Sequence, residues 1–211
     1  MPNALRLGRV CWGGGFAAVT VVLQLWPGAA EWLRFHRPAF EEGAVWQLLT
    51  AQWVHLSLAH AVVNAMAAVL LCWSLAPWVP VRQQLLAWLG GHLGVAVVLA
   101  LDSNCLYYAG ASGALHGVLA GGALVLLCAP LAIPPSGWRV RLMGAVLLLA
   151  LGAKLLLQPL FFATHTHGWL GIPTYYSAHA AGAAGGAVVV LSALLLCRWQ
   201  AAQSQTRQRH E

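Results

Sequence analysis

Long apolar stretches alternate with short polar breaks along the whole chain. The apolar stretches cover residues 10–26, 58–76, 84–101, 113–128, 140–158 and 178–197. Proline, glycine and small polar residues, which end helices, gather in the breaks. Most stretches approach the ~20 residues that a helix needs to cross a hydrocarbon core of ~30 Å. The pattern therefore predicts an all-α membrane domain of six helices at 10–197, between a short basic segment at 1–9 and a basic tail at 198–211.

Composition and charge agree with a membrane protein. Only 8% of the residues are charged and 60% are hydrophobic, against about 25% charged in soluble domains. If the N-terminus is cytoplasmic, the inner segments hold eight arginines and the outer loops hold only Arg34 and Arg37. This bias predicts that both termini are cytoplasmic.

Lys154, near the outer end of the fifth stretch, is expected to extend to the lipid headgroups. A cleaved signal peptide at the first stretch is the disfavoured alternative, since it would leave an odd number of spans.

Few polar residues lie inside the predicted spans, and most of them fall near one end. His60 and Asn64 belong to the second span, Ser112 and His116 to the fourth, and His179 to the sixth. These three spans all run from outside to inside, so His60, Ser112 and His179 share a depth near the outer face, and Asn64 lies one turn below His60. Polar groups in lipid are costly and tend to mark function. We therefore expect them to converge in one layer.

Small residues recur every four positions along the fourth and sixth spans. They are Gly113, Gly117 and Gly121 in one span and Ala178, Gly182 and Gly186 in the other. This period lets helix backbones approach closely, and packing alone is one explanation. Close approach is also what a serine–histidine hydrogen bond requires. The fourth span is short, at about 24 Å, so the preceding loop is expected to lie below the membrane surface and to be covered by protein.

Other catalytic chemistries lack their residues. The metalloprotease motif HExxH is absent, and the one His-Glu pair is His210-Glu211 at the C-terminus. Asp102 is the only acid near a span, so an aspartyl pair cannot form, and a loop-capping role is favoured for it over orienting His179. His165 and His167 in the last outer loop are too few ligands for a stable metal site. We expect no cofactor and no metal.

A serine–histidine pair is the chemistry that remains. His179 would take the proton of Ser112 as general base and return it to the leaving amine. The tetrahedral oxyanion needs hydrogen-bond donors. The backbone N–H of Ser112, the amide of Asn64 and the ring of His60 are the candidates.

Three motifs together resemble the rhomboid family of intramembrane serine proteases. They are His-x-Ser-x-x-His-x-x-x-Asn at 55–64, Gly-x-Ser-Gly at 110–113 and Ala-His-x-x-Gly-x-x-x-Gly at 178–186. The resemblance implies that Ser112 is the nucleophile, that His179 is the base, and that His60 and Asn64 support the oxyanion without a third triad residue. Family members often carry Trp-Arg in the first loop, whereas Gln47 follows Trp46 here. The loop at 159–177 resembles the cap that covers the rhomboid active site.

The run SGALHG and the small size further resemble the rhombosortase subfamily. That resemblance implies a bacterial inner-membrane protease, opening toward the periplasm, that removes C-terminal Gly-Gly sorting tails from exported proteins. Such tails carry one span and a basic end. Gly110 and Gly113 flank the site, and His116 either faces it or simply packs against the sixth span. A general rhomboid protease cutting single-span substrates is one alternative, and an inactive rhomboid-like protein that binds membrane clients is another.

Overall fold

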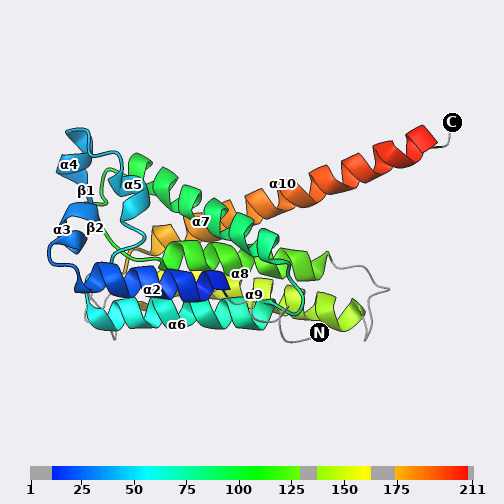
Figure 1. The fold of residues 1–211 in the computed structure, drawn as a ribbon, viewed down its shortest axis with the longest axis horizontal. Coiled ribbons are helices and arrows are strands. Elements are labelled where there is room, and N and C mark those ends of the chain that lie inside the picture. The colour runs from blue at the N-terminus through cyan, green and yellow to red at the C-terminus, as the bar shows by residue number, and fades with distance from the viewer. Residues whose placement is uncertain (1–10, 129–136, 163–173, 209–211) are drawn as a thin grey trace.

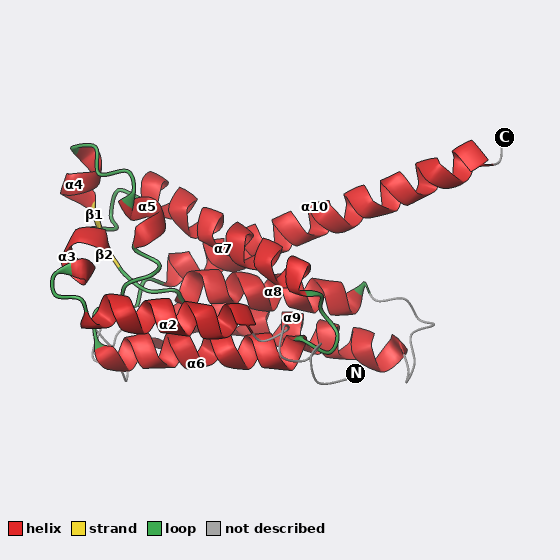
Figure 2. Ribbon diagram, viewed as in Figure 1, coloured by secondary structure: helices red, strands yellow, loops and turns green. Residues whose placement is uncertain are grey.

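The computed structural model describes residues 11–128, 137–162 and 174–208, most of them helical (Figures 1 and 2). The major helices are α2 (Cys11–Leu25), α6 (Leu58–Leu75), α7 (Val81–Leu101), α8 (Ser112–Leu127), α9 (Gly137–Phe162) and α10 (Tyr176–Gln208). The loop between α2 and α6 carries α3 (Ala29–Leu33), β1 (Phe35–His36), α4 (Arg37–Glu41) and α5 (Gln47–Thr50), and β2 (Tyr107–Tyr108) precedes α8.

Each apolar stretch of the sequence corresponds to one major helix. Four of these, α6, α7, α9 and α10, are long and apolar enough to cross a membrane. The other two, α2 and α8, are apolar but shorter, with 15 and 16 residues, so the count of six spans stays a prediction. The sixth helix does not end at residue 197, because α10 continues to Gln208 and its last turns project beyond the other helices (Figure 1).

Helix α8 lies at the centre of the bundle. It packs against α7, α9 and α10, and it touches α6 as well. Most of its residues are buried, among them the glycines at 113, 117 and 121. A Cβ atom added at Gly117 would lie 2.7 Å from the Cα of Gly91 on α7 and 2.8 Å from the carbonyl oxygen of Gly182 on α10. The small residues therefore bring three helix backbones together.

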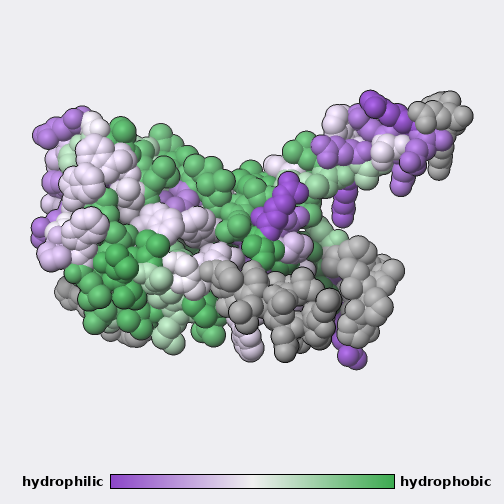
Figure 3. All heavy atoms as spheres, in the orientation of Figure 1, coloured by the Kyte–Doolittle hydropathy of each residue, from purple (hydrophilic) through white to green (hydrophobic). Residues whose placement is uncertain are grey.

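The outer surfaces of the helices are hydrophobic. On α9, Leu149, Leu156 and Leu160 are 74%, 74% and 75% exposed. In Figure 3, hydrophobic side chains cover the middle of the molecule, and hydrophilic ones gather at the loop end and along the projecting part of α10. An apolar surface of this extent is not found on soluble monomers. The chain is a multi-pass membrane protein.

The loop elements at one end pack against one another and against α7. β1 pairs antiparallel with β2, with Phe35 opposite Tyr108. The buried guanidinium of Arg37 donates to backbone carbonyls at the C-terminus of α7, including those of Leu99 and Asp102. Gln47 is also buried, and its Oε1 accepts the backbone N–H of His36 at 3.0 Å. The first loop thus has a guanidinium anchor at position 37 and an amide anchor at position 47.

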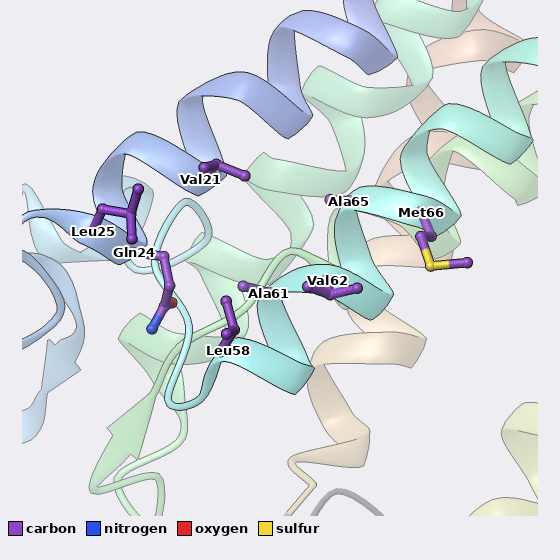
Figure 4. A pocket seen from close by; sticks show the side chains of 8 residues that line it. All are labelled: Val21, Gln24, Leu25, Leu58, Ala61, Val62, Ala65 and Met66. Atoms are coloured by element: carbon purple, nitrogen blue, oxygen red, sulfur yellow. The ribbon is translucent and has the colours of Figure 1, made fainter.

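A cavity of about 140 Å³ opens between α2 and α6 (Figure 4). Its lining is apolar apart from Gln24, and the residues from α6 are Leu58, Ala61, Val62, Ala65 and Met66. None of the polar residues singled out in the sequence lines it. Those polar residues lie instead on α6, α8 and α10.

Candidate active site

A tight turn sets the first residue of α8. Gly110 has φ of 128°, a left-handed conformation that side chains rarely adopt. Its N–H donates to the carbonyl of Ala51 at 2.9 Å, and its own carbonyl accepts the hydroxyl of Tyr108 at 2.8 Å. A Cβ atom at Gly110 would lie 2.6 Å from Cε1 of His60. The turn therefore needs glycine for conformation and for space, and it places Ser112 at the helix N-terminus.

The side chain of Ser112 meets that of His179 across the α8–α10 interface. Ser112 Oγ lies 2.8 Å from His179 Nε2. Below this pair, Gly113 and Gly182 pack backbone to backbone, because a Cβ atom on Gly182 would overlap the carbonyl group of Gly113. His179 is 6% exposed and sits in the first turn of α10. The glycines expected to permit close approach lie directly beside the serine and the histidine.

The second ring nitrogen of His179 has a partner on α9. His179 Nδ1 lies 3.2 Å from Gln158 Oε1. An amide oxygen accepts and does not donate. With the amide in this orientation, Nδ1 carries the proton and Nε2 keeps the lone pair that faces the Ser112 hydroxyl.

His116 lies parallel to His179. The two ring centroids are 4.3 Å apart, with 13° between the ring planes. His116 Nδ1 lies 2.6 Å from the carbonyl oxygen of Ser112, and its Nε2 lies 2.7 Å from Lys154 Nζ. The prediction that Lys154 extends to the headgroups is therefore wrong, because its amine turns inward to His116. His116 packs against His179 of α10, and it also contacts the Ser112 carbonyl.

His60 and Asn64 lie on α6, whose first turn is capped by Ser57. Ser57 Oγ accepts the backbone N–H of His60 at 3.2 Å. His60 reaches the Gly110 turn, and its ring stands edge-on to that of His55 at 4.9 Å between centroids. Among the described residues, neither His60 Nδ1 nor Asn64 Nδ2 has a hydrogen-bond partner. Both groups are thus free to bind something that the described chain does not supply.

Asp102 belongs to the loop after α7. Its Oδ1 accepts the backbone N–H of Asn104 at 3.0 Å, and its Oδ2 accepts the hydroxyl of Tyr175 at 2.5 Å. The Tyr175 hydroxyl is the largest cause that lowers the pKa of the Asp102 carboxyl, followed by Asn104. The carboxylate is engaged in the loop, and the partner of His179 is Gln158 instead.

The sequence reasoning missed Gln158 and misplaced Lys154. A signal was present, because both are polar residues in an apolar stretch and they lie four positions apart, which puts them on one side of a helix. The cap-like loop falls mostly at 163–173, outside the described residues, and so do His165 and His167. Within the described ranges, no three residues of His, Cys, Asp or Glu are grouped to hold a metal.

Comparison with known proteins places these residues in a family. The rhomboid domain family model matches residues 42–198, which is most of the chain and includes every residue of the site. No curated protein and no solved structure gives a significant match. Rhomboid proteases are intramembrane serine proteases that act on membrane-anchored substrates. The chain belongs to the rhomboid family.

Proposed function

We propose that this protein cleaves membrane-anchored proteins with Ser112 as nucleophile and His179 as general base. The observation that carries the proposal is the 2.8 Å contact between Ser112 Oγ and His179 Nε2. A nucleophile and a base within this reach, with the base held by a third group, are the usual signature of an activated serine. Two helices far apart in the sequence bring them together through glycines, which favours selection for this contact over chance.

The reaction would proceed through an acyl-enzyme. Ser112 Oγ attacks the scissile carbonyl carbon while its proton passes to His179 Nε2. The tetrahedral intermediate collapses, the C–N bond breaks, and the proton on Nε2 goes to the leaving amine. Water then attacks the ester, with His179 again as base, and releases the acid product and Ser112.

The oxyanion of the intermediate would lie at the N-terminus of α8. The first N–H groups of a helix have no partner inside the helix, and its dipole favours negative charge there. Ser112 is the first residue of α8, so its own N–H is available. The unpartnered Asn64 Nδ2 and the ring of His60 would add donors from α6. Removal of one such donor costs about 10²–10³ in kcat in other serine proteases.

We further propose that the substrate carries a Gly-Gly segment before a single span and a basic end, and that cleavage occurs near the periplasmic face of a bacterial inner membrane. A peptide must be extended to enter a serine protease site, and two glycines weaken a helix and expose its backbone. The SGALHG run in α8 and the arginine bias of the loops support this choice.

The test uses purified protein reconstituted with a Gly-Gly-tailed single-span substrate. Wild type is expected to release a product whose mass locates the cut at the glycines, and to bind a fluorophosphonate covalently on Ser112. Ser112→Ala and His179→Ala are expected to abolish cleavage. Ser192→Ala, an exposed serine of α10, is the matched control and is expected to cleave normally.

Each outcome separates the hypotheses. Cleavage of an unrelated single-span protein with indifference to Gly-Gly would identify a general rhomboid protease. No cleavage and no phosphonate adduct in folded wild type would overturn the protease proposal and leave the client-binding alternative.

A further inference from the structure

Helix α9 presents two polar side chains to the site. Lys154 and Gln158 lie four residues apart, so they share one side of the helix, while Leu149, Leu156 and Leu160 are exposed on its surface. Lys154 Nζ reaches His116 Nε2 at 2.7 Å, and Gln158 Oε1 reaches His179 Nδ1 at 3.2 Å. A third helix thus contacts both imidazoles of the site.

The contact of Gln158 decides which nitrogen of His179 can act as a base. A neutral imidazole has one N–H and one lone pair. If Nδ1 donates to Gln158 Oε1, the lone pair is on Nε2, which faces Ser112 Oγ. In the opposite tautomer Nε2 would point an N–H at the serine, and it could not accept the serine proton.

The stack on His116 complements this contact. Parallel packing at 4.3 Å fixes the plane of the His179 ring but leaves rotation within that plane free. A hydrogen bond at Nδ1 removes this freedom. The ring of His116 is itself held at both nitrogens, by the carbonyl of Ser112 and by Lys154. The ring on which His179 stacks therefore has a fixed position.

We propose that Gln158 is a positioning residue that acts through His179, so that the site is a Ser112–His179–Gln158 arrangement. The inference rests on the proposed function of Ser112 and His179. Through the cycle, Nδ1 keeps its proton and its bond to Gln158 Oε1, while Nε2 takes the proton from Ser112 and gives it to the leaving amine. The amide oxygen, with its partial negative charge, stabilises the imidazolium that forms in between.

A neutral amide suits this position in a membrane. A carboxylate in lipid costs several kcal/mol unless it is paired, and a glutamine supplies an acceptor without that cost. The one acid near the spans, Asp102, is engaged by Tyr175 and Asn104. The chain therefore supplies the third group from α9 as an amide.

The experiment compares Gln158→Met and Gln158→Glu with wild type in the reconstituted cleavage assay across pH. Methionine keeps the length but loses the strong acceptor, and kcat is expected to fall about tenfold with KM unchanged, the effect of one neutral hydrogen bond. Glutamate restores an acceptor, so kcat is expected to recover. The acid limb of the pH profile of Gln158→Glu is expected at higher pH than in wild type, because a carboxylate favours the protonated His179 ring.

Gln24→Met, the same change on α2, is the matched control and is expected to match wild type.

A second measurement does not depend on cleavage. Nitrogen chemical shifts of the His179 ring are expected to report a proton on Nδ1 in wild type and a mixture of tautomers in Gln158→Met. Unchanged kcat, pH profile and ring shifts in Gln158→Met would overturn the inference about Gln158. Cleavage by wild type in the same experiment would still support the proposed function. If wild type neither cleaves nor binds the phosphonate, the proposed function itself fails.

Discussion

At the level of the candidate site, the two sides of α8 are built in different ways. Toward α10 it packs backbone to backbone, and a Cβ atom on Gly186 would lie 2.5 Å from the Cα of Gly117. On the α9 side the polar layer depends on long side chains, since Lys154 reaches His116 on α8 and Gln158 reaches His179 on α10. The first interface sets how close the serine and the histidine come, and the second sets how the two imidazoles are oriented.

The Ser112–His179 distance and the orientation of the imidazole rings therefore depend on different contacts. Backbone contacts tolerate no added atom, because protein interiors are close-packed and a new methyl group forces helices apart. Side-chain contacts can be removed with less movement of the backbone. At the site, an atom added on the α10 side is therefore expected to be far more damaging than a side-chain contact removed on the α9 side.

The largest effect is expected from Gly182→Ala. The new methyl group would overlap the carbonyl of Gly113, so α10 must move away from α8 and carry His179 away from Ser112. We expect cleavage to be lost and the free energy of unfolding to fall by about 1–3 kcal/mol, the usual cost of overpacking. The measurements are the cleavage rate and the thermal unfolding midpoint in detergent.

Gly152→Ala provides the matched control on α9. Gly152 has no heavy atom within 4 Å of an added Cβ, and alanine is the better helix former by about 1 kcal/mol. Activity should stay at the wild-type level and stability should stay equal or rise slightly. Equal damage from both alanines would show that the effect of Gly182→Ala does not come from its contact with the Gly113 carbonyl.

A smaller effect is expected from His116→Phe. Phenylalanine can keep the stack on His179 but loses the contacts to Lys154 and to the Ser112 carbonyl. We expect kcat to fall about tenfold with the fold intact. Near-total loss of activity in a folded protein would instead assign His116 a part in the chemistry.

The smallest effect on activity is expected from His55→Phe, which should change the pH dependence of stability. Burial, with a further contribution from His60, lowers the pKa of His55 from 6.5 to about 3. The unfolded chain therefore binds a proton that the folded one excludes, and wild type loses stability as pH falls from 6.5 toward 3, by up to about 1.4 kcal/mol per pH unit. His55→Phe should remove that part of the pH dependence of the unfolding midpoint. Parallel curves for the two proteins would refute this.

Much of the site could be predicted because its signals are local in the sequence. The positions of Ser112, His179, His60 and Asn64 follow from polar residues at similar depth in three apolar stretches, and glycines at a period of four indicate close helices. Gln158 could not be assigned in this way, because one amide in an apolar stretch does not show which neighbour it faces. Lys154 was misplaced for the same reason, since its chain is long enough to reach either headgroups or His116.

The sequence by itself determined the order of the apolar helices and the family, because hydropathy and motifs are properties of the chain. Only the tertiary structure decided what lies opposite each polar atom. It joined His179 Nδ1 to Gln158, turned Lys154 to His116 and bound Asp102 to Tyr175. The physical reason is that helix rotation and side-chain direction are fixed by the packing of all the helices at once, and no local pattern in the sequence records them.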